Sequence, residues 1–474
     1  EFRRVLFRSR ITTAMIRSPM SILKYFWNSL TKPNADFEAR YSRRNLLLYL
    51  FIYKTVIEVV YIASISPAFT YYGLGLNIDL LKFALSTVMV FLLHLISPRS
   101  KNDPSTFLFL IMEIVIIIPT LSYFWMNDKS VVYAVYLFLS SCIICVILKF
   151  RRKKIILDAV LSHYLLDALF AGYVLMAVLL IIERGGIDPR AFSFQSIYEL
   201  RAEYNMSRIS GYLMNWSAKV FAPFFFVYHF YHGNKVRFVV VVFLQALMYL
   251  SFGNKAFLLS IAHLVFVQFV MIRSRNSSGM FVGLLTAANA AALVTDILGL
   301  TTVLRNLLPY RMLFVPSMGQ FRYFEFFTVH NKLMFSEGAL GKLVGTTYEY
   351  DKPIGFIVNQ FFRGEDFISN GNTGIFSYAF ADYGFPGMIV MAVILGGVFW
   401  IIDSTTYRLP VFVAVGALSY SAVILNDTGL LVSLWTGGIV LMVLMLMLFN
   451  SEQKYAYKLP ALRFRRRLTY DRDH

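Results

Sequence analysis

The chain has 474 residues, of which 58% are hydrophobic, 17% aromatic and only 15% charged. A soluble domain of this composition would expose a very large apolar surface, so the composition excludes a soluble protein and predicts an integral membrane protein. The formal net charge of +18 is concentrated in short segments between apolar runs. There it predicts membrane topology, and we expect no nucleic-acid partner.

The first residues differ in character from the rest. Residues 1–14 begin with EFRRVLFRSR and resemble sequencing-adaptor read-through more than a signal peptide, so we expect the natural protein to start at Met15 or Met20. Residues 15–45 then form a cytoplasmic N-terminal segment, residues 46–449 a polytopic membrane domain, and residues 450–474 a basic cytoplasmic tail.

The membrane domain contains twelve apolar runs. A helix needs about 20 mostly apolar residues to cross about 30 Å of hydrocarbon. The runs that meet or approach this length are 46–64, 76–96, 105–124, 130–149, 155–182, 210–230, 236–252, 255–272, 280–300, 376–402, 409–425 and 430–449. We therefore predict an all-α fold of about twelve transmembrane helices.

Basic residues between these runs predict the orientation. If the N-terminus is cytoplasmic, so are the even-numbered connections, which carry Arg99, Lys101, Lys149, Arg151, Arg152, Lys153, Lys154, Lys235, Arg237, Arg273, Arg275 and Arg408. The short odd-numbered connections hold only Lys129 and Lys255. The positive-inside rule therefore places both termini in the cytoplasm.

Two long connections, 183–209 and 301–375, are then extracytoplasmic. They carry the arginines Arg184, Arg190, Arg201, Arg208, Arg305, Arg311, Arg322 and Arg363 among many aromatic residues. Arginine offers a planar fork of donors that matches phosphate oxygens, and aromatic faces suit sugar rings. The alternative is an interfacial aromatic belt whose arginines extend to lipid headgroups.

Three sequence blocks resemble Wzy-type O-antigen and oligosaccharide repeat-unit polymerases. They are IYELRAEYNMSRISGYLMNWSAKVFAP, LPYRMLFVPSMGQFRYFEFFTVHNKLMFSEG and NTGIFSYAFADYGFPGMIV. The resemblance implies an inverting, metal-independent glycosyltransferase of the GT-C type in the bacterial cytoplasmic membrane. Such an enzyme transfers a growing glycan from undecaprenyl diphosphate to the next carrier-linked repeat unit. Its expected partners are that lipid-linked oligosaccharide, membrane lipid and a chain-length regulator protein.

Candidate site residues follow from this chemistry. The only D-x-D sequence is Asp471 to Asp473 in the basic tail, so we expect no metal and no other cofactor. Arginines would then stabilise the diphosphate. Substrate-binding candidates are Arg201, Arg208, Arg305, Arg311, Arg322, Tyr323, Lys219 and Asn372. Catalytic candidates are His330, Glu325 and Asp382, although His330 could be a solvated loop residue, Glu325 could pair with an arginine and Asp382 could cap a helix.

Ionisable residues inside the apolar runs need partners or a function. Lys54 with Glu58, and His163 with Asp167, are spaced i, i+4, which predicts two local structural pairs. Lys219 has no such partner in its own run, so it is a candidate for facing a cavity. Cys142 and Cys145 lie in an apolar run without further ligands, and we interpret them as packing residues.

Two rival functions fit parts of the same pattern. An O-antigen ligase would share the large outer loop and a histidine there, but would transfer glycan to a lipid A core. A transporter or flippase for lipid-linked sugars would also suit twelve spans, but transporters usually show internal repeats, and the two halves of this sequence show no convincing repeat.

Overall fold

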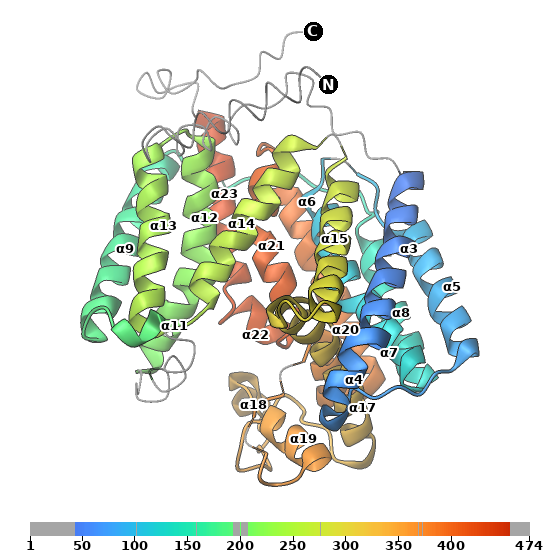
Figure 1. Ribbon diagram of the computed structural model, residues 1–474. Helices are drawn as coiled ribbons and strands as arrows, with labels where there is room; N and C mark the ends of the chain where they lie inside the picture. Colours follow the sequence, from blue (N-terminus) through green and yellow to red (C-terminus); the bar gives the residue numbers. More distant parts are fainter. Residues whose placement is uncertain are drawn as a thin grey trace.

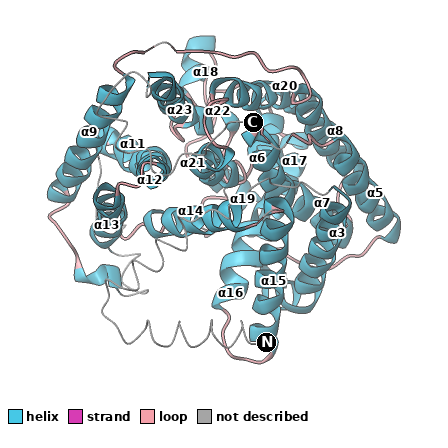
Figure 2. Cartoon of the chain, turned by 90° about the horizontal axis from the view of Figure 1, so that it is seen from above, coloured by secondary structure: helices cyan, strands magenta, loops and turns pink. Residues whose placement is uncertain are grey.

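The computed structural model describes residues 43–100, 102–157, 159–192, 200, 207–274, 276–367, 369–371 and 373–455. Within these ranges the secondary structure is helical, and the β-structure there is limited to one isolated bridge between Asn77 and Asn127. Figures 1 and 2 show the helices as one bundle, from the side and from above. The predicted all-α class is confirmed.

The first half of the bundle alternates long helices with short π or 3-10 segments, which we label η. Its first part consists of α3 (Arg43–Val60), η1 (Tyr61–Ile65), α4 (Ser66–Phe69), η2 (Thr70–Tyr72), α5 (Leu80–Ile96), α6 (Pro104–Met112), η3 (Glu113–Ile117), α7 (Ile118–Met126) and α8 (Val131–Ile147). Its second part consists of α9 (Ser162–Glu183), η4 (Pro189–Phe192), α11 (Arg208–Trp216), η5 (Ser217–Phe221), α12 (Ala222–Tyr231), α13 (Lys235–Phe252) and α14 (Ala256–Arg273).

The second half begins with α15 (Ser277–Ile297). It continues with α16 (Val303–Arg305), η6 (Asn306–Phe314), α17 (Val315–Val329), α18 (Ala339–Val344), α19 (Ile354–Arg363), α20 (Ile375–Thr405), α21 (Val411–Ile424), α22 (Leu430–Leu434) and α23 (Ile439–Tyr455). Each of the twelve predicted apolar runs overlaps helix in this order.

Eight helical segments among the described residues are long and apolar enough to cross a membrane. They are Asn45–Tyr72, Pro104–Met126, Ser162–Glu183, Lys235–Phe252, Ala256–Arg273, Ser277–Ile297, Ile375–Thr405 and Leu430–Lys454. Three shorter apolar helices are Leu80–Ile96, Val131–Ile147 and Val411–Ile424. An integral membrane protein is therefore the class that the fold supports.

The helix from Pro104 to Met126 forms the centre of one half of the bundle. Its most apolar stretch is 100% buried, whereas that of the peripheral helix Ser162–Glu183 is only 28% buried. Peripheral helices instead expose large apolar side chains such as Leu81, Val236 and Ile182. This outward apolar surface is what a helix facing hydrocarbon requires.

Proline accounts for the π segments. Each of η1, η3, η5 and η6 is followed two residues later by a proline: Pro67, Pro119, Pro223 and Pro316. Proline lacks an N–H and its ring clashes with the carbonyl four residues earlier. A widened π turn just before the proline relieves that clash without ending the helix.

Connections meet at two separate ends of the bundle. At the first end, which we call the basic end, Ile155 N donates to Ser404 O, Ala159 N to Ser451 Oγ, and Arg408 N to Asn450 Oδ1. At the other, the loop end, Asn77 N donates to Met126 O, Leu333 N to Ala381 O, and Ile375 N to Leu425 O. Even-numbered connections thus meet one another and odd-numbered ones do the same, as helices that alternate across a membrane require.

The long connection 301–375 is largely helical. Residues 303–329 form one continuous helix through α16, η6 and α17, and α18 and α19 follow it. The helix α17 packs against α7, α19 and α20, with Gln320, Arg322 and Tyr323 buried. In Figure 1, α17, α18 and α19 lie at the lower end of the bundle. The other long connection includes residues 193–199 and 201–206, which lie outside the described residues.

The two ends can be assigned to membrane faces by labelling. In a background with Cys142 and Cys145 replaced by Ala, we expect Gly338→Cys to react with a membrane-impermeant thiol reagent in intact cells, or in spheroplasts if an outer membrane is present. Lys153→Cys, at the basic end, should react only after permeabilisation, because the positive-inside rule places it in the cytoplasm. Labelling of Lys153→Cys alone would reverse this orientation.

Candidate functional site

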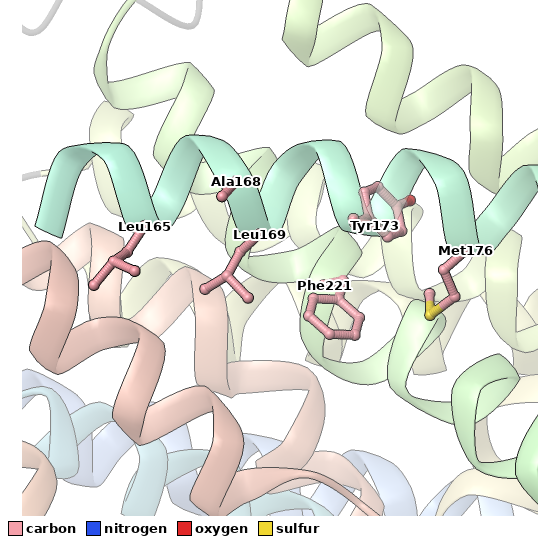
Figure 3. Close-up of a pocket in the computed structure, with 7 residues that line it drawn as sticks. Leu165, Ala168, Leu169, Tyr173, Met176 and Phe221 are labelled. Atoms are coloured by element: carbon pink, nitrogen blue, oxygen red, sulfur yellow. The ribbon is translucent and has the colours of Figure 1, made fainter.

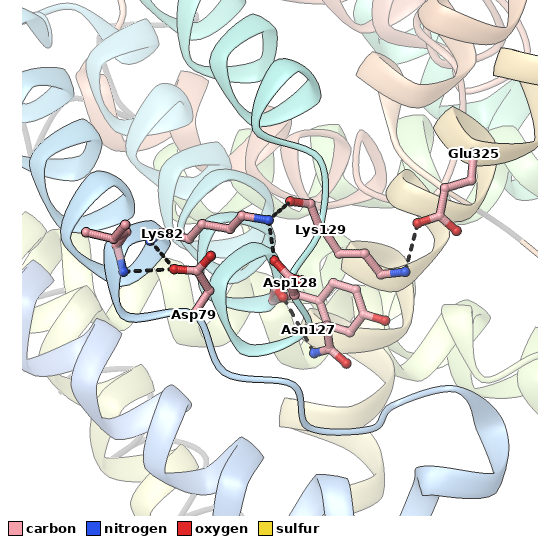
Figure 4. A network of polar contacts seen from close by, with 8 residues as sticks. Asp79, Lys82, Asn127, Asp128, Lys129 and Glu325 are labelled. Atoms are coloured by element: carbon pink, nitrogen blue, oxygen red, sulfur yellow. Dashed lines mark hydrogen bonds and ion pairs between the residues drawn. The ribbon is translucent and has the colours of Figure 1, made fainter.

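A polar network fixes α17 to the loop end (Figure 4). Lys82 Nζ donates to Asp128 Oδ1 at 2.5 Å and to Lys129 O at 2.7 Å. Lys129 in turn forms an ion pair with Glu325 of α17 at 2.8 Å. Glu325, predicted as a catalytic candidate that could instead pair with an arginine, is thus paired with a lysine. This ion pair joins α17 to the turn after α7.

Buried hydrogen bonds set the position of α17 more firmly. Gln320 Nε2 donates to Thr120 Oγ1 at 2.8 Å, and Tyr133 OH donates to Gln320 Oε1 at 3.2 Å. Both ends of the buried amide therefore have partners, which removes the cost of burying it. These contacts join α17 to α7 and α8 and fix which residues of α17 face the loop end.

Three aromatic rings at this end have arginines beside them. The rings of Phe69 and Tyr310 stack at 3.9 Å between centroids, and Tyr72 meets Tyr310 edge-on at 6.1 Å. The guanidinium of Arg305 lies 5.3 Å from the Phe69 ring, and that of Arg363 lies 3.7 Å from the Tyr72 ring. We call Arg305, Arg311, Arg322 and Arg363 the arginine cluster. It draws together α16, η6, α17 and α19.

Arg322 is the buried member, with 8% of its surface exposed. Its Nη2 donates to Tyr72 O at 2.7 Å and its Nη1 to Asn359 Oδ1 at 3.4 Å. Gly73 has φ of +94°, and a Cβ there would lie 2.4 Å from Arg322 Nη2, so glycine is required for both backbone and space. Burial lowers the pKa of Arg322 below its usual range, and the nearby positive charge of Arg363 adds to this.

The cluster carries more positive charge than the protein neutralises. Arg305 pairs with Asp296 at 2.8 Å. Within the described ranges, Arg311, Arg322 and Arg363 form no ion pair with a carboxylate, and Arg363 Nη1 is buried without a hydrogen-bond partner. Arg311 is exposed, whereas Arg322 is buried and Arg363 is half-buried. Like charges that are held together and partly desolvated are unfavourable unless an anion joins them, and guanidinium forks suit phosphate oxygens.

His330 is the C-cap residue at the end of α17. Its ring stacks on Phe326 at 3.9 Å, and its Nδ1 lies 2.9 Å from Phe326 O. A carbonyl can only accept, so Nδ1 carries the proton and Nε2 of the neutral ring is an acceptor. His330 follows Arg322 by eight residues, about 12 Å along a helix. The structure thus leaves His330 Nε2 available for proton transfer.

Asp382 and Tyr323 take part in local structure. Asp382 Oδ1 accepts from Phe335 N at 3.0 Å, just before α20 kinks at Tyr383 and Gly384. Its carboxylate therefore holds the turn that follows α17. Tyr323 is buried, and its hydroxyl donates to Gly371 O at 3.3 Å. Their predicted roles toward substrate stay predictions.

Some predicted residues cannot be placed. Arg201 and Asn372 lie outside the described residues, and the side chain of Arg208 does so as well. Sequence reasoning named Arg363 as a loop arginine but did not select it for the site, and it missed Phe69, Tyr72 and Asn359. The run TYYG at 70–73 is an aromatic signal next to a glycine, but nothing in its spacing predicts contact with residues 250 positions later.

The two predicted intramembrane pairs are confirmed. Lys54 pairs with Glu58, whose Oε1 also accepts from Ser122 Oγ at 2.8 Å and Trp125 Nε1 at 2.7 Å. His163 lies 3.4 Å from Asp167, which also binds Arg237. These groups are satisfied by their neighbours. Cys142 and Cys145 are free cysteines in the interior of the bundle, as packing residues would be.

A separate cavity of about 330 Å³ lies along α9 (Figure 3). Its lining consists of Leu165, Ala168, Leu169, Gly172, Tyr173, Met176 and Phe221. The hydroxyl of Tyr173, the one polar side-chain group among them, accepts from Gln245. Figures 1 and 2 both place α9 on the opposite side of the bundle from α17. Apart from the Tyr173 hydroxyl the cavity is lined by apolar groups, so we assign it no catalytic role.

Comparison with protein-family models, curated proteins and solved structures gives no match for this chain. In the described part of the chain, no group of three or more His, Cys, Asp or Glu side chains is arranged to hold a metal ion. The interpretation of the site therefore depends on its own residues.

Lys332 supplies a further cation at the loop end. Its Nζ donates to Phe327 O at 2.6 Å and lies 3.8 Å from the centre of the Phe380 ring. Partial burial lowers its pKa to about 8. Burial therefore disfavours the charged form of Lys332 in the folded state. While the lysine is protonated, this lowers the free energy of unfolding.

We expect Lys332→Met to raise thermal stability at pH 7. Between pH 8 and the usual lysine pKa, the unfolded chain binds more protons than the folded chain, so the wild-type stability rises with pH. The advantage of the variant should accordingly shrink over that interval. Thermal unfolding of detergent-purified protein from pH 7 to pH 10 checks this. A gain that is independent of pH would show that burial of the charge is not the cause.

Proposed function

We propose that this chain is a glycosyltransferase that polymerises lipid-linked oligosaccharide repeat units. It moves the growing glycan from undecaprenyl diphosphate onto the nonreducing end of the next carrier-linked unit. The observation that carries the proposal is the arginine cluster, whose three unneutralised guanidinium groups lie at the end of a membrane bundle. A diphosphate on a lipid carrier is an anion that reaches this place from the bilayer.

The chemistry requires charge stabilisation at the leaving group. As the bond between the anomeric carbon and the diphosphate oxygen breaks, negative charge grows on that oxygen. Arg322 and Arg363 are fixed by Tyr72, one by its carbonyl and the other by its ring. Such preorganised donors need little rearrangement when the charge develops. The acceptor hydroxyl attacks from the opposite side, which inverts the anomeric centre.

The membrane arrangement that we propose has all twelve predicted runs crossing the bilayer, in a GT-C-like architecture. The loop end is then extracytoplasmic, and both termini lie on the cytoplasmic side of a bacterial inner membrane. The grouping of even and odd connections at opposite ends of the bundle supports this arrangement. It brings the arginine cluster to the face where carrier-linked units are joined.

A ligase would use the same donor, so the acceptor separates the two activities. A polymerase extends carrier-linked chains, whereas a ligase forms product on lipid A core. A transporter would produce no new glycosidic bond from purified components. The arginine cluster suits the diphosphate-linked substrate of all three activities. The three sequence blocks that resemble repeat-unit polymerases favour the polymerase.

The arginine cluster predicts a graded loss of activity. We expect Arg322→Ala and Arg363→Ala each to lower turnover about ten- to over a hundredfold, since each removes charge-assisted bonds worth about 1.5 to 3 kcal/mol. Lys should restore activity only partly, because it keeps the charge without the bidentate fork. Arg305→Ala should cost less, because Asp296 already neutralises Arg305. The measurement is glycan chain length, normalised to protein in the membrane.

A matched control is Arg99→Ala, an exposed arginine at the basic end whose Nη2 donates to the backbone carbonyl of Leu95. It should leave chain length unchanged. If Arg322→Ala and Arg363→Ala are present at normal levels and still make full-length glycan, the cluster does not hold the donor diphosphate.

The charge of the cluster also predicts metal independence. Three unneutralised guanidinium groups repel a divalent cation and replace its role on the diphosphate. Purified protein should elongate lipid-linked repeat units in excess EDTA at the rate seen without it. Complete loss of elongation in EDTA, restored by Mg²⁺ or Mn²⁺, would contradict an arginine-based mechanism.

A further inference from the structure

The connection between α21 and α22, residues 425–429, lies between two packed elements of the loop end. On the side of α20, Ile375 N donates to Leu425 O at 3.1 Å, and a Cβ on Gly374 would lie 3.0 Å from the same oxygen. On the side of η6, Asn426 Nδ2 donates to Met312 O at 2.9 Å. Figure 1 shows α22 at the lower end of the bundle, between α11 and α17. The connection is therefore held rigidly in the middle of this end.

Asp427 on this connection is near enough to Lys219 of η5 for their charges to interact. The two side chains interact electrostatically, yet within the described residues neither makes a hydrogen bond or a close ion pair. Both are partly exposed. Opposite charges that interact without a direct hydrogen bond can both be satisfied by a polar ligand that contacts them. Lys219, predicted from sequence to face a cavity, thus has a partner from a distant part of the chain.

Two buried polar atoms belong to residues close in sequence to this pair, Asn426 and Trp216. Asn426 is 2% exposed, its Nδ2 is bound to Met312 O, and its Oδ1 has no partner in the part of the chain that the structure describes. Trp216 Nε1, on the turn before η5, is likewise buried without an acceptor there. A buried acceptor and a buried donor without partners are costly unless a ligand or water uses them.

The site adjoins the arginine cluster. Met312, whose carbonyl binds Asn426, follows Arg311 directly in η6. A second link runs through Tyr378, which packs against Gly429 and whose hydroxyl lies 3.5 Å from that of Tyr323. These contacts join the connection 425–429 to η6, which carries Arg311, and through Tyr378 to α17, which carries Arg322.

We infer that Asp427, with Lys219 and Asn426 beside it, binds the acceptor sugar and takes the proton of its attacking hydroxyl. This inference rests on the proposed function and adds to it the acceptor site and its base. In the transfer, the hydroxyl proton passes to the Asp427 carboxylate while the hydroxyl oxygen bonds to the anomeric carbon of the donor. The bond from that carbon to the diphosphate breaks, and its electron pair leaves with the diphosphate oxygen.

The charges around Asp427 suit a base. Burial raises the pKa of Asp427 to about 6, and the positive charge of Lys219 opposes that rise. Tyr420 of α21 is the other titratable group that interacts with it. A base works best when its pKa lies near the working pH, so that it is ionised and still accepts a proton readily.

The experiment measures the elongation rate of purified protein as a function of pH. Donor and acceptor are both supplied as lipid-linked repeat units, and the acceptor is limiting. For the wild type we expect kcat/KM for the acceptor to fall as pH drops through about 6, where Asp427 becomes protonated. Asp427→Asn should lower turnover at least about 100-fold, a typical contribution of a general base. Lys219→Met should move the fall to higher pH, because the charge that lowers the pKa of Asp427 is gone. The control Asp128→Asn, which removes a loop-end carboxylate bound to Lys82, should leave the profile unchanged.

A second measurement separates this inference from the proposed function. Equilibrium binding of undecaprenyl diphosphate to purified protein should be unchanged in Asp427→Asn and weakened in Arg363→Ala. If the wild type elongates units but Asp427→Asn keeps its rate, or if Lys219→Met leaves the pH profile in place, Asp427 is not the base and only this inference falls. If the wild type forms no glycosidic bond from these substrates, the proposed function falls and this inference falls with it. If Asp427→Asn does not reach the membrane, Lys219→Met carries the test.

Discussion

The buried amide of Gln320 is the contact on which the loop end depends. Helix 303–329 carries arginine, glutamine and serine into a membrane bundle, where an unpaired polar group costs several kcal/mol. Thr120 and Tyr133 satisfy both ends of that amide. Once Gln320 is fixed against α7 and α8, Arg322 lies one half-turn further along, at the level of Tyr72. The position of the arginine cluster thus follows from an uncharged hydrogen bond.

The same end shows how charge is divided between structure and function. Lys129, Glu325, Lys82 and Asp128 neutralise one another in pairs and tie the connections together. Arg305 is neutralised by Asp296 in the same way. Arg311, Arg322 and Arg363 are left without a carboxylate among the described residues, although carboxylates are present nearby. This excess positive charge is what the proposed diphosphate donor would neutralise.

Sequence patterns predicted the helical class and the Lys54–Glu58 and His163–Asp167 pairs, because these depend on local spacing. The helical nature of 303–329 escaped prediction because its polar residues break the apolar run and their partners, such as Thr120, lie almost 200 residues away. The partner of Lys219 escaped for the same reason, since Asp427 is on another helix connection. The arginines were identified by residue type, but only the fold shows that Arg305 is neutralised and that Arg363 joins Arg322.

Proline placement links the fold to the chemistry. Three of the four π segments that precede a proline contain an ionisable residue: Glu113 in η3, Lys219 in η5 and Arg311 in η6. A π turn inserts one residue into the helix. It therefore rotates the direction of every later side chain about the helix axis. In a bundle whose outer surface must be apolar, that rotation allows Glu113 to be buried and Lys219 to be half-buried while the apolar pattern continues on the lipid side, whereas Arg311 is exposed. On this argument the prolines 67, 119, 223 and 316 do more than bend helices, since the π turns before them bring Lys219 and Arg311 to the same end of the bundle, where a charged substrate would bind.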